Sequence, residues 1–180
     1  MKKRILLLAV IILPLFASAQ TYVKLNGLYW AAGVINGSVE TWINDNMTFN
    51  VDAVFSPWSS IDSYPFVLGQ LVPEVRYYTN SIFDGFYVGA FASLHTYKMA
   101  KWSSLKSEQY FKGSGYGMGL SAGYQFFITN RWNLDLYVGY GWAYGNHKKY
   151  DINTDEAVTG SKGTGTWIPM KIGVGISYSL

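Results

Sequence analysis

Charged residues recur at alternate positions of segments that are otherwise apolar or rich in glycine. In an extended strand, alternate side chains share one face, so these charges should lie together on one side of a sheet. The residues are Lys24, Glu40, Asp52, Glu74, Arg76, Asp135 and Lys171, accompanied by Asn26 and Arg131. A buried charge without a partner is costly, and the planar guanidinium of arginine can hold two carboxylates. We therefore expect an ion-pair network centred on Arg76 and held by Glu40, Glu74 or Asp135.

Two histidines are the strongest candidates for catalysis, because the chain has no cysteine. Ser93 and His95 share a strand face, where a histidine can activate a serine nucleophile. This spacing alone does not establish the geometry of a catalytic site. A histidine that is simply hydrogen-bonded within a polar interior is the better explanation of His95. His147 lies in a polar run typical of a solvated loop. We expect no catalytic residue, no metal site and no cofactor.

A second group of cations comprises Lys98, Lys101, Lys106 and Lys112, opposed in that segment by Glu108 alone. Aromatic residues are interleaved with these lysines. Cations and aromatic side chains at a membrane surface are suited to binding the phosphates of lipopolysaccharide. A solvated loop explains the pattern equally well. Lys101, Lys106 and Lys112 are therefore candidate contacts for lipopolysaccharide.

The composition excludes disorder, because apolar residues make up 49% of the 180 residues and charged residues only 14%. The 14 basic residues include Lys2, Lys3 and Arg4, and the other 11 match the 11 acidic residues. Binding to nucleic acid needs a surplus of positive charge, so nucleic acid is not an expected partner.

Residues 1–19 have the three parts of a secretory signal peptide. Lys2–Arg4 precede an apolar run from Ile5 to Phe16, and Ala17–Ala19 supply the small residues of a cleavage site. The run is shorter than the ~20 residues needed to span a bilayer, which disfavours an uncleaved anchor. The expected mature domain is 20–180.

Apolar and polar residues alternate along the rest of the chain, which predicts an all-β fold. Longer loops near 57–65, 99–113 and 145–165 alternate with short turns. Along the last segment, Ile168, Met170, Ile172 and Val174 share one face, and Lys171 lies on the other. Strands are expected near 22–32, 36–43, 47–56, 66–79, 84–98, 114–128, 131–144 and 166–180.

The apolar faces are interpreted as facing lipid. A soluble barrel of the lipocalin kind would direct them inward, whereas a membrane barrel directs them outward. Glycines fill the polar faces, which suits a narrow interior, and aromatic residues such as Trp132 and Tyr178 collect toward strand ends. With the export signal, these features predict an eight-stranded antiparallel up-and-down transmembrane β-barrel in the outer membrane, with its long loops outside.

Five segments carry a family resemblance: Asn26–Trp30, Val72–Tyr78, Gly117–Gln125, Asn130–Asp135 and Pro169–Val174. Together they resemble the family called domain of unknown function 3575, small outer-membrane proteins of Bacteroidetes. The resemblance covers essentially the whole mature chain. It implies an eight-stranded barrel with the layout of the OmpA membrane domain, and it brings no established reaction or ligand.

The final strand resembles the C-terminal signal read by the barrel-assembly machinery, through Gly175, Tyr178 and Leu180. Leucine stands where phenylalanine is usual.

The expected function is that of a monomeric, non-enzymatic outer-membrane protein in contact with outer-membrane lipid and lipopolysaccharide. Its exterior loops would act in envelope integrity or surface-appendage interactions with an unidentified protein partner. Passage of small or apolar solutes and modification of lipid A remain as alternatives. Glycines on the last three expected strands oppose large residues such as Trp30, Trp42 and Tyr78 on the early ones. This packing predicts a filled interior and no steady ion conductance.

Overall fold

The computed structural model describes residues 20–59, 65–99, 109–151, 154, 156–158 and 162–180. The expected signal peptide therefore lies outside the described residues. Eight antiparallel strands form a closed barrel in which each strand pairs with its neighbours in sequence and β1 pairs with β8. The strands are β1 (Thr21–Asn26), β2 (Ile35–Asn44), β3 (Met47–Ser59), β4 (Pro65–Tyr78), β5 (Gly85–Met99), β6 (Gln109–Phe127), β7 (Trp132–Asp151) and β8 (Lys162–Ser179). The expected all-β class and strand number are confirmed.

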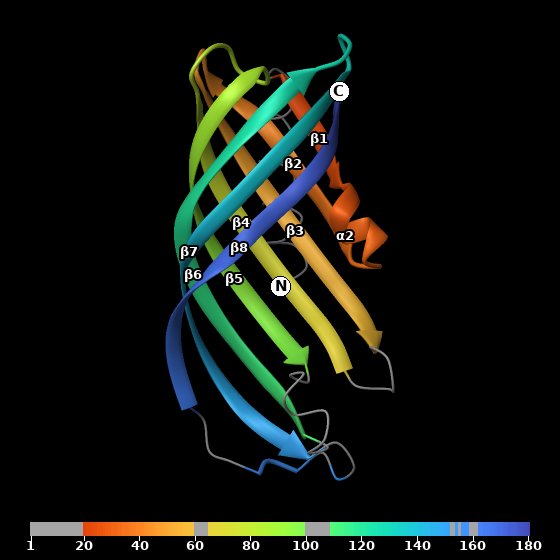
Figure 1. Ribbon diagram of the computed structural model, residues 1–180, viewed down its shortest axis with the longest axis vertical. Coiled ribbons are helices and arrows are strands. Elements are labelled where there is room, and N and C mark those ends of the chain that lie inside the picture. Colours follow the sequence, from red (N-terminus) through yellow and green to blue (C-terminus); the bar gives the residue numbers. More distant parts are fainter. Residues whose placement is uncertain (1–19, 60–64, 100–108, 152–153, 155, 159–161) are drawn as a thin grey trace, which may run out of the picture.

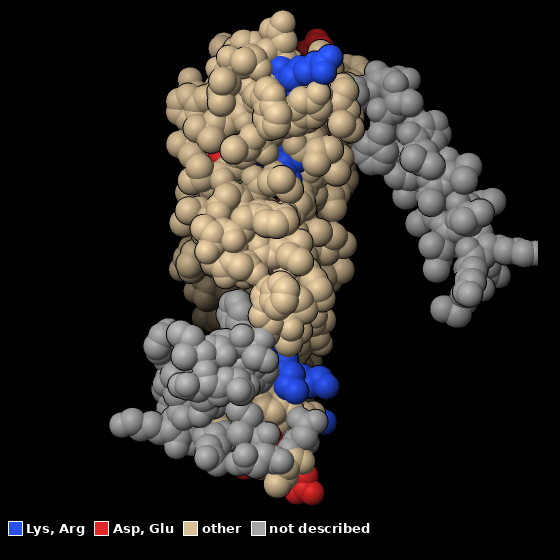
Figure 2. Space-filling view, turned by 90° about the vertical axis from the view of Figure 1, so that its right-hand side faces the viewer, with Lys and Arg blue, Asp and Glu red and all other residues tan. Residues whose placement is uncertain are grey.

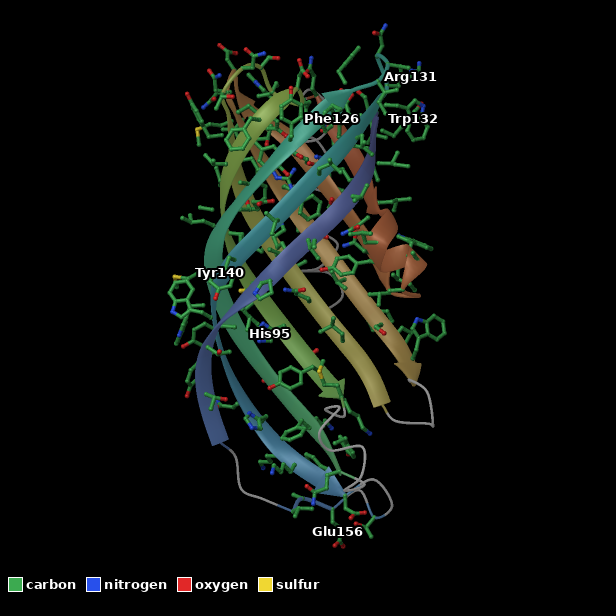
Figure 3. The ribbon with its side chains drawn as sticks, viewed as in Figure 1. His95, Phe126, Arg131, Trp132, Tyr140 and Glu156 are labelled. Carbon is green, nitrogen blue, oxygen red and sulfur yellow. The ribbon has the colours of Figure 1, made fainter. Side chains whose placement is uncertain are left out.

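The two ends of the barrel differ in their connections (Figure 1). The short connections β2–β3, β4–β5 and β6–β7 lie at the upper end in this view, together with the C-terminus; we call this the short-turn end. The last residues of β3, β5 and β7 and the first residues of β4, β6 and β8 lie at the lower end, which we call the long-loop end. Arg131 and Trp132 mark the first end and Glu156 the second (Figure 3).

The first strand is shorter than expected, because β1 ends at Asn26 and a helix, α2 (Gly27–Ala31), follows. The Asn26 side chain accepts a hydrogen bond from the Leu28 amide, which caps the helix N-terminus. The side-chain nitrogen Nδ2 of Asn26 donates a hydrogen bond to the Ile172 carbonyl oxygen of β8. This bond takes the place of continued backbone pairing between β1 and β8. Trp30 is consequently 51% exposed on α2 and does not fill the interior as expected.

A bulge in β8 overturns another expectation. Val138 and Gly139 pair with Ile172 and Lys171, but Tyr140 pairs with Pro169, which leaves Met170 as an extra residue. One extra residue reverses the faces of the strand beyond it. Met170 is buried with Lys171, so the expectation that it faces outward is wrong.

The outer surface of the barrel carries an apolar band. Val88, Leu120, Val138 and Ile172 are each exposed on it, as alternation predicts. Figure 2 shows charged side chains gathered toward the two ends, with an almost uncharged band between them. Among the described residues, no helix is long and apolar enough to cross a membrane.

Candidate functional site

A buried ion-pair network fills the barrel beside Arg76. The Nη1 atom of Arg76 lies 2.8 Å from Glu40 Oε2 and 2.9 Å from Asp135 Oδ2. Its Nε atom lies 2.8 Å from Glu74 Oε2. These four residues come from β2, β4 and β7, and all are buried. The guanidinium therefore joins strands from opposite walls, and it contacts all three of the carboxylates that were expected as alternatives.

Two lysines extend the network from β1 and β8. Lys24 pairs with Glu40 and, at 2.8 Å, with Asp135. Lys171 Nζ lies 2.7 Å from Glu74 Oε2. Both lysines are buried, and each shares a carboxylate with Arg76. Every cation of the network is thus paired, which offsets the cost of removing it from water.

Asp52 is also buried, and its described hydrogen-bond partner is an amide side chain outside the ion-pair network. Asn36 Nδ2 donates to Asp52 Oδ1 at 2.5 Å. Asn26, also predicted to face inward, donates to the Tyr137 hydroxyl at 2.9 Å. The network therefore contains six of the seven predicted charged residues, and the seventh, Asp52, is buried with Asn36 as its described hydrogen-bond partner.

Arg131 departs from the prediction, because it is exposed at the short-turn end, where Nη1 donates to the Tyr178 hydroxyl at 3.0 Å. It precedes the first residue of β7, so strand parity does not bury it. Trp42 is 43% exposed near the end of β2 and likewise does not fill the interior.

Tyrosines that were not predicted as site residues complete the carboxylate contacts. Tyr87 donates to Asp135 Oδ1 at 2.9 Å, and the Arg76 guanidinium lies 4.5 Å from the centre of the Tyr87 ring. The Tyr78 hydroxyl lies 2.8 Å from Glu40 Oε1 and 2.7 Å from Gln125 Oε1. Their inward parity was a usable signal, because Tyr78 follows Arg76 by two positions.

Little space remains within the network. The cavity that touches Lys24, Arg76 and Asp135 measures about 10 Å³, close to the smallest volume that holds one water molecule. On the side of the long-loop end, Val72, Phe91, Ala143 and Met170 form a buried apolar layer. The lumen is therefore filled by the charged side chains of the network and, toward the long-loop end, by the apolar side chains of this layer.

Beyond the apolar layer, the barrel interior contains a cavity of about 440 Å³. Gln70 and His95 line it from paired positions of β4 and β5. Ser93 is buried, and its Oγ has no hydrogen-bond partner among the described residues, so this part of the chain shows no Ser93–His95 pair. Nor do the described residues contain a cluster of three or more side chains suited to a metal ion.

The predicted lysine group is only partly described. Lys101 and Lys106 lie outside the described residues. Lys112 is exposed on β6, which begins at Gln109, so its expected place in a loop is wrong. It pairs in register with Lys98 of β5 and Lys148 of β7, which places three lysines side by side. Paired residues share a face, so this lysine row follows the outer face near the long-loop end.

His147, expected in a loop, also belongs to β7, which extends to Asp151. β6 and β7 pair as far as Gln109 and Asp151, beyond the expected strands 114–128 and 131–144. The polar composition of these segments did not indicate strand pairing. The pairing forms at the end of β6 and β7 that lies opposite to the turn joining the two strands.

A closed eight-stranded antiparallel barrel with a buried ion-pair network defines the structural class of this protein. The model of the family described as protein of unknown function (DUF3575) matches residues 5–180, and the chain belongs to this family. None of the curated proteins matches the chain.

Proposed function

We propose that this protein is a non-conducting outer-membrane barrel that acts through the surface at its long-loop end, in envelope integrity or surface interactions. The observation that carries the proposal is the combination of a lumen filled by the Arg76 network with an apolar outer band. A polar, filled interior and an apolar exterior invert the arrangement of a soluble protein, as a membrane barrel requires.

The lysine row of Lys98, Lys112 and Lys148 supports the orientation of this proposal. Lysines at the border of the apolar band are positioned to meet the phosphates of lipopolysaccharide, since basic groups near an anionic surface are attracted to it. The long-loop end then faces the exterior, and the partner at that surface is an unidentified envelope component.

Two measurements test the proposal. The folded protein should fractionate with the outer membrane and migrate differently on gels before and after heating. In planar bilayers, the purified barrel should show no steady ion conductance, because displacing the Arg76 ion pairs inside the barrel is costly.

Recovery as a soluble periplasmic protein would contradict the membrane placement. Stable single-channel steps in the wild-type barrel, altered by Glu74→Gln or Asp135→Asn, would contradict the filled lumen and favour solute passage. Arg131→Gln is the matched control, because Arg131 is exposed outside the network.

A further inference from the structure

The cavity beyond the apolar layer is separate from the Arg76 network. Its volume of about 440 Å³ lies within the ~300–1,000 Å³ range of small-molecule sites. Ala143 and Met170 line it and also belong to the apolar layer, so the cavity is closed on the side of the network. Neither the ion pairs nor the lysine row uses this space.

One side of the cavity lacks a full strand. β1 pairs with β8 only between Tyr22–Asn26 and Gly175–Ser179, so β8 residues 163–172 have described strand pairing with β7 alone. In Figure 1, β8 diverges from β1 and α2 below the segment where β1 and β8 pair. Tyr29 of α2 lines the cavity together with Thr164 and Thr166 of β8. Thr164 and Thr166 are exposed although they line the cavity, so the cavity is open to the outside along this edge of β8, on the side of α2.

Exposed tryptophans lie on α2 and β8, the two elements that border this opening, and a third contacts the segment just after α2. Trp30 lies on α2, and Trp167 follows the cavity-lining Thr166 on β8 and is 63% exposed. Trp58 of β3 donates a hydrogen bond to the Gly33 carbonyl oxygen, just after α2. Tryptophan collects at the border between hydrocarbon and headgroups. These side chains align the opening with the outer-leaflet interface in the proposed orientation.

The shape and lining of the cavity restrict its occupant. An eight-stranded barrel is only wide enough for side chains to fill, so a ligand lying within it must be thin. Leu68, Met99, Ile168 and Met170 supply an apolar lining. The polar side chains of Gln70 and His95 lie side by side in register, where they can donate hydrogen bonds to a carboxyl or ester oxygen.

We propose that this cavity binds one linear acyl chain, of a fatty acid or of a lipid, which enters through the opening between α2 and β8. Binding depends on the cavity alone, whereas a membrane source for the chain rests on the proposed outer-membrane placement.

Radiolabelled palmitic acid can be titrated against the purified barrel held in an amphipathic polymer without acyl detergent. The wild-type protein should bind it saturably at one site. Thr166→Trp should weaken binding at least tenfold, because the larger side chain occupies the cavity from the open edge of the strand. Val138→Trp is the matched control, since Val138 is 53% exposed on the outer face, and it should bind as the wild type does.

Heat-modifiable migration verifies that each variant is folded. If Thr166→Trp fails to fold, Ile168→Trp tests the same cavity from the same strand. Absence of saturable binding by the folded wild-type barrel would overturn the proposal. Equal affinity in a folded cavity variant and in Val138→Trp would also overturn it.

A lysophospholipid with the same acyl chain distinguishes the two sources when it competes with the labelled fatty acid. Competition supports a membrane lipid as ligand, and its absence, with palmitic acid still bound, supports a free fatty acid. A barrel that binds palmitic acid but fractionates as a soluble protein would refute the membrane placement and leave the binding site supported.

Discussion

Replacing Arg76 with leucine tests whether the buried network stabilises the barrel. The guanidinium contacts Glu40, Glu74 and Asp135 at 2.8–2.9 Å. Arg76→Leu removes these contacts and leaves three buried carboxylates to be neutralised by Lys24 and Lys171 alone. Leucine also fills less of the space between the opposite walls.

The expected loss follows from the cost of breaking buried pairs. Removing one partner of a buried ion pair typically costs about 3–5 kcal/mol. For a domain of this size, each kcal/mol corresponds to a Tm change of about 2–4 °C. Arg76→Leu should therefore lower the Tm of the purified barrel by roughly 6–20 °C, a range obtained by combining the two relations.

Far-ultraviolet circular dichroism in detergent micelles measures this change, and heat-modifiable migration provides an independent reading. Arg131→Leu is the control, because Arg131 is exposed and its described side-chain bond goes to the Tyr178 hydroxyl. A surface change of this kind is expected to stay within about 0.5 kcal/mol. Equal Tm values for the two variants would refute the role of the network.

A second variant separates lost pairing from lost packing. Adding Glu40→Gln to Arg76→Leu removes one of the carboxylates that would otherwise lack its arginine partner. The double variant should be less destabilised than the sum of the two single changes, since the residues are directly coupled. Strict additivity would mean that Arg76 acts through its volume and not through its charge.

Three further outcomes are expected. Val138→Arg should reduce insertion into lipid vesicles by about 2–4 kcal/mol if this face lies near the bilayer midplane, whereas Val138→Leu should insert normally; equal insertion would contradict the lipid-facing assignment. Gly123→Val should lower the Tm, because a Cβ at Gly123 would lie 2.5 Å from a tyrosine ring packed on it, and overpacking costs about 1–3 kcal/mol; an unchanged melting curve would show that the ring can move. The double variant Lys112→Glu/Lys148→Glu should weaken co-sedimentation with lipopolysaccharide at low salt, whereas Arg131→Glu at the opposite end should not; similar losses in both would indicate a nonspecific effect of charge.

Local alternation determined most of the fold from the sequence. Side chains two positions apart in a strand share a face, so the pattern around Glu74 and Arg76, or around Asp135, identifies inward charges without knowledge of the neighbouring strands. The same rule assigned Val138 and Ile172 to the outer surface. The burial of seven charged residues and the eight-strand count could therefore be predicted.

Strand ends and irregularities depended on contacts that local alternation does not contain. Asn26 ends β1 because its side chain both caps α2 and bonds to β8. The bulge at Met170 turns that residue inward, although its apolar neighbours continue the alternation expected of an outward face. The end of β1 depends on its contacts with β8, and the bulge depends on the pairing of β7 with β8.

The choice of partners within the network was decided by closure of the barrel. Arg76 and Asp135 are 59 positions apart and meet through a hydrogen bond across the lumen. Local parity shows that both point inward but not how far around the barrel or along its axis each one lies. The shear of the closed sheet sets those positions. Sequence alternation thus identified the buried charged side chains of the strands, and only the tertiary structure determined which of them pair.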